Sequence, residues 1–157
     1  MAFPKIVLAL IYVFSSVISA HATIVTPCTA IGDFPLPDNV EIGNCVEPPC
    51  LFPINSTFNI AMNFTSPRRL DHIAPQAVAE TPILLVDLPL EQENACDGIV
   101  NTECPLEAGE DVEYTLQMSV SPVFGETPFA MEFLLLDVDK LSFFECFRAD
   151  MQMTELE

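Results

Sequence analysis

The sequence predicts an all-β protein, a sandwich or barrel of antiparallel strands. Hydrophobic residues alternate with polar ones at a period of two, which is typical of strands with one buried face. The 157 residues include 14 prolines, which leave little room for a long helix. Six cysteines follow an apolar N-terminal stretch, as in small disulfide-stabilised domains. The length fits a single domain, and we find no internal repeat.

Residues 1–22 are predicted to be a secretory signal peptide. Lys5 supplies the positive charge, residues 6–17 are apolar, and Ala20-His21-Ala22 forms an A-x-A cleavage pattern. A membrane anchor is the alternative, but the apolar run is shorter than the roughly 18 to 20 residues that a spanning helix needs. We therefore expect a soluble domain over residues 23–157, either secreted or delivered to an endosomal or lysosomal lumen.

The clearest strand patterns lie in residues 58–65 and 112–120, where every second residue is apolar. The inward face of the first consists of Phe58, Ile60, Met62 and Phe64. The inward face of the second consists of Val112, Tyr114, Leu116, Met118 and Val120.

Two further runs alternate less regularly, and residues 40–42 and 83–88 are shorter strand candidates. In the third run the predicted inward residues are Phe129, Met131, Phe133 and Leu135. In the fourth run they are Leu141, Phe143, Glu145 and Phe147.

The spacing of the cysteines favours one disulfide pairing among the many that six cysteines allow. Each of two close pairs encloses a short loop, which leaves the first cysteine to join the last. The favoured pairs are Cys45 with Cys50, Cys96 with Cys104, and Cys28 with Cys146. A zinc site is the alternative, but the chain has no C-x-x-C motif, and His72 is the only histidine after the predicted cleavage site.

The composition excludes several classes of partner. Five Lys and Arg residues against 23 Asp and Glu residues give a formal net charge of -18. Such a chain cannot neutralise nucleic-acid phosphates or adhere to anionic membranes through clustered basic residues. Because half of the residues are hydrophobic, the chain is expected to fold. Its acidic surface favours a soluble monomer.

Catalytic and cofactor motifs are not found in the sequence. His72 lies in a proline-flanked stretch without a G-x-S-x-G motif, so we expect it to be a loop histidine. The five glycines form no phosphate-binding pattern. Neighbouring carboxylates, such as Asp137 with Asp139 and those within residues 107–113, are expected in so acidic a chain and do not match an EF-hand. The sequence predicts no enzyme, no cofactor and no metal site.

Two N-glycosylation sequons begin at Asn55 and Asn63. Asn63 falls on the polar face of its predicted strand, where a glycan could project into water. In a secreted chain we expect at least one of the two sequons to carry a glycan.

The cysteines and the motifs around them occur in a characteristic order. After Cys28 come Cys45-Val-Glu-Pro-Pro-Cys50, Asn63-Phe-Thr65, Cys96, Cys104-Pro-Leu106, Gly109, Tyr114, Met131-Glu-Phe133 and Phe144-Glu-Cys-Phe147. This order resembles the ML lipid-recognition domain family over nearly all of residues 23–157. The family includes the Niemann-Pick type C secreted sterol carrier, its arthropod relatives and the mite group-two allergens.

The resemblance implies an immunoglobulin-like β-sandwich of two antiparallel sheets, with one lipid held in an internal apolar cavity between them. It implies the same three disulfides that the spacing favours. It also places a tunnel entrance at Leu88, Val120 and Phe124. The chain departs from the family at Pro27-Cys28-Thr29-Ala30, where Asp-Cys-Gly-Ser is common, at Phe133, which replaces a Trp, and in the size or polarity of two entrance residues. These departures concern the identity of the lipid more than the fold.

The implied function is to sequester a sterol, fatty acid or similar small lipid and to hand it to a membrane or a receptor. Such a cavity has a volume of roughly 300 to 1,000 Å³. The candidate wall residues are Phe58, Ile60, Met62, Phe64, Val86, Tyr114, Leu116, Met118, Met131, Phe133, Leu135 and Phe147. Alternation shows only that a face is buried, so a solid core is the alternative for these residues.

Two other functions remain as alternatives. In the first, the domain is an innate-immune recognition protein that presents a bacterial lipid to a receptor. That function calls for a basic rim, whereas only Arg68 and Arg69 form a local basic pair. In the second, the protein is a hydrolase built on carboxylates.

Overall fold

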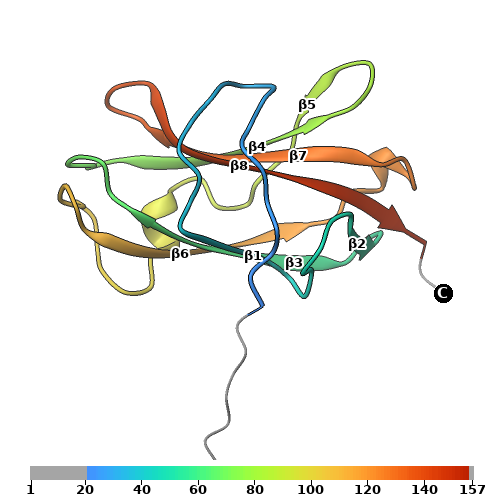
Figure 1. Ribbon diagram of the computed structural model, residues 1–157, viewed down its shortest axis with the longest axis horizontal. Helices are drawn as coiled ribbons and strands as arrows, with labels where there is room; N and C mark the ends of the chain where they lie inside the picture. Colours follow the sequence, from blue (N-terminus) through green and yellow to red (C-terminus); the bar gives the residue numbers. More distant parts are fainter. Residues whose placement is uncertain (1–20, 156–157) are drawn as a thin grey trace, which may run out of the picture.

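The computed structural model describes residues 21–155, which form a sandwich of two β-sheets (Figure 1). The predicted signal peptide lies almost wholly outside these residues. The 3-stranded sheet has the order β1 (Asn39–Ile42), β3 (Thr57–Thr65), β6 (Asp111–Ser119). The 5-stranded sheet has the order β2 (Cys50–Pro53), β8 (Ser142–Thr154), β7 (Phe129–Asp137), β4 (Ile73–Glu80), β5 (Leu85–Asp87).

All strand pairs are antiparallel except β2 with β8, which run parallel. Within residues 21–155 the helical elements are two short 3-10 segments, η1 (Ala95–Gly98) and η2 (Pro122–Phe124). No helix in this range has the length and apolarity needed to cross a membrane. The predicted all-β sandwich is confirmed.

Strands β3 and β6 follow the predicted alternation. They pair over their full length, from Thr57 opposite Ser119 to Thr65 opposite Asp111. Their apolar residues are buried between the sheets, whereas most of their polar residues are exposed on the outer face. This sheet therefore has one buried face and one solvent-exposed face.

Strand β7 shows why the third run alternates poorly, because nearly all of its residues are buried. Its inner face packs between the sheets. Its outer face is covered by the N-terminal segment, where Leu134 packs with Cys28, Ile31 and Phe34. A central strand covered on both faces has no polar side.

The predicted inward face of residues 141–147 is wrong at Phe143, because β8 contains a bulge, and at Leu141, because that residue lies before the strand. The register shifts between Leu135, which pairs with Glu145, and Leu136, which pairs with Phe143. The inserted residue, Phe144, joins the core, whereas Phe143 packs against the outer cluster, which consists of Cys28, Leu134 and Cys146. Leu141 precedes the strand and is 80% exposed. Beyond the bulge, Phe147 points inward as predicted.

Strands β2 and β4 were not predicted, and the candidate at 83–88 is a strand over Leu85–Asp87 only. Strand β4 contains Pro75, which lacks a backbone N–H. Pro75 pairs with Leu135 on one side, while β5 pairs only with Val78–Glu80 on the other. The proline therefore lies where β4 has a free edge, which a strand tolerates.

The N-terminal segment ties the two sheets together along one side. The Thr23 N–H donates to the Val40 carbonyl, and the Ile42 N–H donates to the Thr23 hydroxyl, so Thr23 is bound to β1. Three residues later, Thr26 and Arg148 exchange backbone hydrogen bonds, so the segment is also bound to β8. Figure 1 shows this segment in blue, crossing in front of both sheets.

Three disulfides fix the connections between strands. Cys28–Cys146 fastens the N-terminal segment to β8, Cys45–Cys50 closes the loop between β1 and β2, and Cys96–Cys104 closes a loop that includes most of η1. This is the pairing that the spacing favours.

Candidate functional site

A small apolar cavity lies between the sheets at one end of the sandwich, where β3 begins and β6 ends. Its volume is about 20 Å³. Strands β3, β6, β7 and β8, the segment after β5 and the segment containing η2 all contribute to its lining. The lining residues are Phe58, Leu88, Pro89, Met118, Ser119, Val120, Ser121, Phe124, Phe129, Met131, Met151 and Met153.

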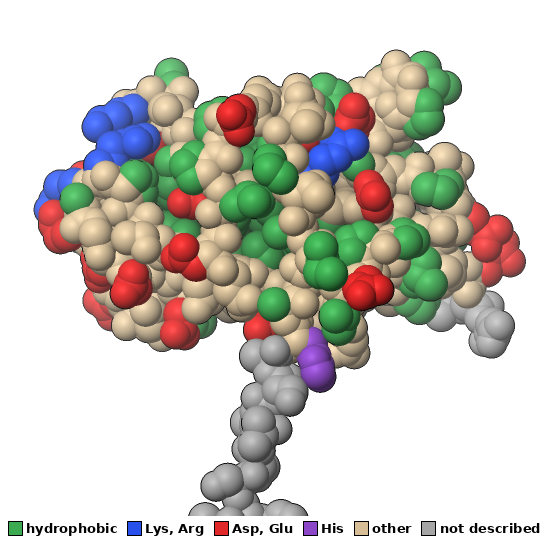
Figure 2. Space-filling model, in the orientation of Figure 1, with side chains coloured by type: hydrophobic (Ala, Val, Ile, Leu, Met, Phe, Trp, Pro, Cys, Tyr) green, Lys and Arg blue, Asp and Glu red, His purple; other side chains and the backbone are tan. Residues whose placement is uncertain are grey.

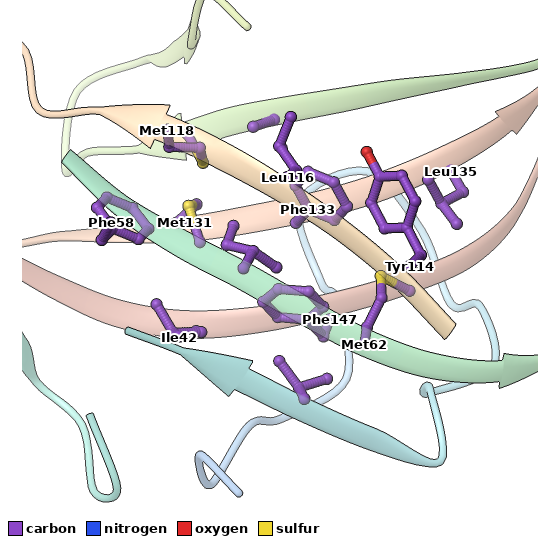
Figure 3. Packing of buried hydrophobic residues seen from close by; sticks show 14 of the residues in the cluster. Ile42, Phe58, Met62, Tyr114, Leu116, Met118, Met131, Phe133, Leu135 and Phe147 are labelled. Carbon is purple, nitrogen blue, oxygen red and sulfur yellow. The ribbon is translucent and has the colours of Figure 1, made fainter. Parts of the chain in front are cut away.

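Four methionines dominate this end of the core. Met118 lies on β6, Met131 on β7, and Met151 and Met153 on β8, and all four are buried. Figure 3 shows Met118, Met131 and Phe58 toward one end of the core, and Tyr114 toward the other. Because the methionine side chain is unbranched and polarizable, this lining can change shape at low energetic cost.

Segment η2 covers the mouth of the cavity. The Phe124 ring stacks on the Phe129 ring with centroids 4.6 Å apart. The Val123 N–H donates to the Ser121 hydroxyl at the start of the segment. Gly125, at a φ of 54°, ends it in the left-handed region that glycine tolerates. The short segment thus holds a half-buried aromatic side chain over the opening.

Polar side chains are few at the mouth. Among the lining residues they are Ser119 and Ser121. The Ser119 side chain lies on the exposed face of β6, where its hydroxyl donates a hydrogen bond of 3.3 Å to Glu91 Oε1.

A second polar pair lies deeper along β6. The buried Tyr114 hydroxyl donates to Gln92 Oε1, and Gln92 Nε2 donates to the Thr115 carbonyl. Burial raises the pKa of Tyr114 above its ordinary value, so the hydroxyl stays protonated. Its hydrogen-bonding needs are met within the protein.

A family model described as an ML domain matches residues 22–153. The chain belongs to the ML domain family. Its fold is similar to the crystal structure of a Niemann-Pick type C2 protein from Japanese carpenter ant, with a TM-score of 0.71 and 17% sequence identity. That match covers 83% of this chain and 99% of the ant chain. No curated protein sequence matches this chain at a significant level.

In this ML domain the three entrance residues implied by the resemblance, Leu88, Val120 and Phe124, all line the cavity. Three candidate wall residues, Phe58, Met118 and Met131, line it too. Val86 is only half-buried. The other candidates are buried in the core away from the cavity; they are Ile60, Met62, Phe64, Tyr114, Leu116, Phe133, Leu135 and Phe147.

Several lining residues are not among those predicted from the sequence. Met151 and Met153 continue the period of two from Phe147 along β8, and this signal would have found them. Phe129 was placed on an inward face but was not included among the wall residues. Pro89 and Ser121 lie outside the strands, where alternation carries no information, and Ser119 lies on the exposed face of β6, as the alternation of that strand indicates.

The predicted cavity size of 300 Å³ or more is wrong for this structure. Aromatic rings fill the centre of the ML domain, where Tyr114 stacks on Phe133 with centroids 6.2 Å apart and Phe133 stacks on Phe147 at 5.6 Å. All three side chains are fully buried. The small cavity therefore lies beyond these rings, at the methionine-lined end of the core.

Glu132 has a structural role on the outer face of the larger sheet. Burial opposes its ionisation, but N–H donors from Ala30, Thr29 and Ile31, together with Arg148, outweigh burial and lower its pKa. Its carboxylate lies near the sulfurs of Cys28 and Cys146, but these are bonded to each other and offer no thiolate to a metal.

His72 is exposed and directly precedes β4. His72 Nδ1 lies 3.0 Å from Asp139 Oδ2, and this hydrogen bond raises the pKa of His72. No nucleophilic hydroxyl is hydrogen-bonded to this histidine within the described residues.

Proposed function

We propose that this ML domain is a secreted, monomeric carrier that sequesters a sterol, fatty acid or similar small lipid between its sheets. The observation that carries the proposal is the apolar, methionine-lined cavity at the place where the resemblance puts the entrance. Transfer of hydrocarbon from water into such a lining is favourable by about 25 cal/mol per Å² of buried surface. The lipid would then pass to a membrane or a receptor protein.

Entry of a lipid requires the lining side chains to move apart, because the open volume is close to that of one water molecule. Two features favour such movement. The methionines have flexible side chains, and Phe124 is held by a 3-10 segment of only three residues. The rigid central stack of Tyr114, Phe133 and Phe147 limits how deep the widened cavity reaches.

Presentation of a bacterial lipid is less well supported. Arg68 and Arg69, the local basic pair, are both engaged with carboxylates: Arg68 with Asp137, and Arg69 with Asp71 and Glu107. They offer no free cationic rim to lipid phosphates.

A binding experiment tests the carrier proposal. Delipidated protein is titrated with a fluorescent sterol and with a fluorescent fatty acid. Leu88→Trp, at the mouth, is expected to weaken binding by about tenfold or more because it overfills the cavity. Val100→Trp, at an exposed position in the Cys96–Cys104 loop, serves as the matched control and is expected to bind like the wild type. Failure of the wild type to bind either probe would show that the proposal is wrong.

Secretion and glycosylation form part of the same proposal. Expression in eukaryotic cells is expected to yield a protein in the medium whose N-terminus is Thr23. Asn55 and Asn63 are exposed, which supports a glycan at either position. Asn55→Gln and Asn63→Gln are expected to reduce the mass that glycosidase treatment removes. Retention of the full-length chain inside the cells would contradict this part.

A further inference from the structure

A wide groove lies on the flank where β1 and β2 are the edge strands of the two sheets. Its volume is about 940 Å³, whereas the internal cavity measures about 20 Å³. Strand β1 pairs only with residues 60–63 of β3, so it ends before it reaches the start of β3. The groove lies beside this start, between β3, β2 and the loop that joins β1 to β2. It is therefore at the same end of the sandwich as the cavity.

One aromatic side chain separates the groove from the cavity. Among the described residues, Phe58 is the one that lines both spaces. Its ring stacks on the Phe52 ring of β2 with centroids 4.2 Å apart, so the pair bridges the two sheets. Gly43 leaves room beside this pair, because a Cβ atom at that position would lie 2.9 Å from a carbon of the Phe52 ring. The Phe58 ring is thus the partition between the two spaces.

The free polar groups of the groove suit a hydroxyl-rich ligand. Asn44, Thr57 and Asn59 line it with exposed residues whose side chains make no hydrogen bond to any other group within residues 21–155. Side-chain amides and hydroxyls offer both donors and acceptors, the combination that glycerol and sugar hydroxyls need. Leu51, which is 58% exposed, adds apolar surface to the same groove.

The charges of the groove disfavour an anionic ligand. Its ionisable side chains are carboxylates, those of Glu41 and Glu47, and no basic residue of the described chain lines it. On the face that Figure 2 shows, Lys and Arg side chains gather at the left end, with one further basic side chain nearer the right. A lipid carboxylate or phosphate in the groove would therefore be repelled, in a protein whose formal net charge is -18.

We infer that this groove is a second lipid-binding subsite, which takes the neutral, hydroxyl-rich head group of a lipid such as a monoacylglycerol. The hydrocarbon chain of that lipid passes Phe58, which moves aside, and enters the methionine-lined cavity. The inference rests on the proposed carrier function and adds an opening and a head-group class to the same cavity. Fatty acids, whose carboxylate the groove repels, enter by the mouth beside Phe124.

Cross-linking locates the head group. A 1-oleoylglycerol analogue that carries a diazirine on its glycerol is bound to the delipidated protein and irradiated, and the labelled peptides are identified by mass spectrometry. We expect most of the label within residues 41–61, which supply all the lining residues of the groove except Thr115. If most of the label lies elsewhere, for example at residues 119–124 of the mouth, the inference is overturned.

A bulky side chain in the groove tests the same subsite by affinity. Displacement of a neutral fluorescent probe compares 1-oleoylglycerol with oleate, which has the same hydrocarbon chain. Ala61→Trp, on the outer face of β3, is expected to weaken binding of 1-oleoylglycerol about tenfold because it fills the groove, and to affect oleate little. Gln117→Trp, on the outer face of β6 but outside the lining, is the matched control and should bind both lipids like the wild type.

The outcomes separate this inference from the carrier proposal. Equal losses for the two lipids in Ala61→Trp, or a loss of the same size in Gln117→Trp, would overturn the inference and leave the carrier function intact. Binding of oleate without binding of 1-oleoylglycerol by the wild type would do the same. If neither lipid displaces the probe and no sterol or fatty-acid probe binds, both proposals fail.

Discussion

Phe124 and Phe129 stack across the mouth of the cavity, one from the η2 segment and one from the first position of β7. This contact joins a short loop element to a central strand of the larger sheet. It is the aromatic contact that a lipid would have to displace or pass in order to reach the methionines.

Removing the Phe124 ring should speed lipid exchange. We expect Phe124→Ala to raise the dissociation rate of a bound fluorescent fatty acid about three- to tenfold, since an aromatic pair adds roughly 0.5 to 1.5 kcal/mol beyond its buried area. Stopped-flow mixing with excess unlabelled lipid measures this rate. Phe143→Ala, in the outer cluster, is the control and should release the probe at the wild-type rate. An unchanged rate in Phe124→Ala would mean that lipid enters elsewhere.

The disulfides should contribute unequally to stability. Cys28 and Cys146 are 118 positions apart, whereas Cys45 and Cys50 are 5 apart. In the chain-entropy model, replacing the first pair by alanine should lower the free energy of unfolding by about 5 kcal/mol, and replacing the second by about 2 kcal/mol. Urea titrations of the two double variants provide the comparison. A larger loss from the short loop would contradict the model.

Glu132 should be needed for the N-terminal segment to dock. Glu132→Gln loses the charge that accepts from three backbone N–H groups and Arg148, and we expect it to cost roughly 3 kcal/mol of unfolding free energy. Glu80→Gln, which removes the more exposed partner of Arg148, should cost less than about 1 kcal/mol. Similar losses in the two variants would show that the backbone contacts of Glu132 contribute little.

Glu145 should make the protein more stable at acidic pH. Burial, followed by repulsion from Asp38, raises its pKa from 4.5 to about 7, and its buried Oε2 atom has no hydrogen-bond partner among residues 21–155. The folded state therefore holds the proton more tightly than the unfolded chain. The resulting stabilisation is complete below about pH 4.5 and is lost as the pH rises through about 7, with a size of roughly 2 to 3 kcal/mol.

Glu145→Gln isolates this effect. Chemical unfolding of the wild type and of the variant is measured from pH 4 to pH 8, and the difference between their free energies is plotted against pH. We expect the wild type to lose stability relative to the variant as the pH rises. A difference that does not change with pH would show that Glu145 titrates normally.

The sequence predicted best those elements whose two faces meet different surroundings. Strands β3 and β6 have water on one side and the core on the other, so their alternation gave the correct inward residues. Strand β7 is covered on both sides, so its alternation is weak, although its predicted inward residues do lie in the core. The bulge at Phe144 reverses the faces of β8 through backbone geometry, which composition does not reveal.

The candidate site was predictable in position but not in volume. Leu88, Val120 and Phe124 lie together at one end of the sandwich and line the cavity, and their role as a lipid entrance stays a prediction. Whether inward side chains meet or leave a space depends on the separation of the sheets and on rotamers across the gap. Tyr114 and Phe133 point inward whether the core is filled or hollow. Their stacking fills the centre of the core, and the sequence pattern does not reveal it.

The hydrogen bonds of Thr23 and Thr26 to the two sheets limit where the sheets can separate. They join the two sheets along the flank formed by β1 and β8. The opposite flank, between β6 and β4, is spanned by a looped segment in which η1 touches both strands. Because both flanks are bound together, the sheets should separate most easily at the end where β3 begins and β6 ends, next to the cavity.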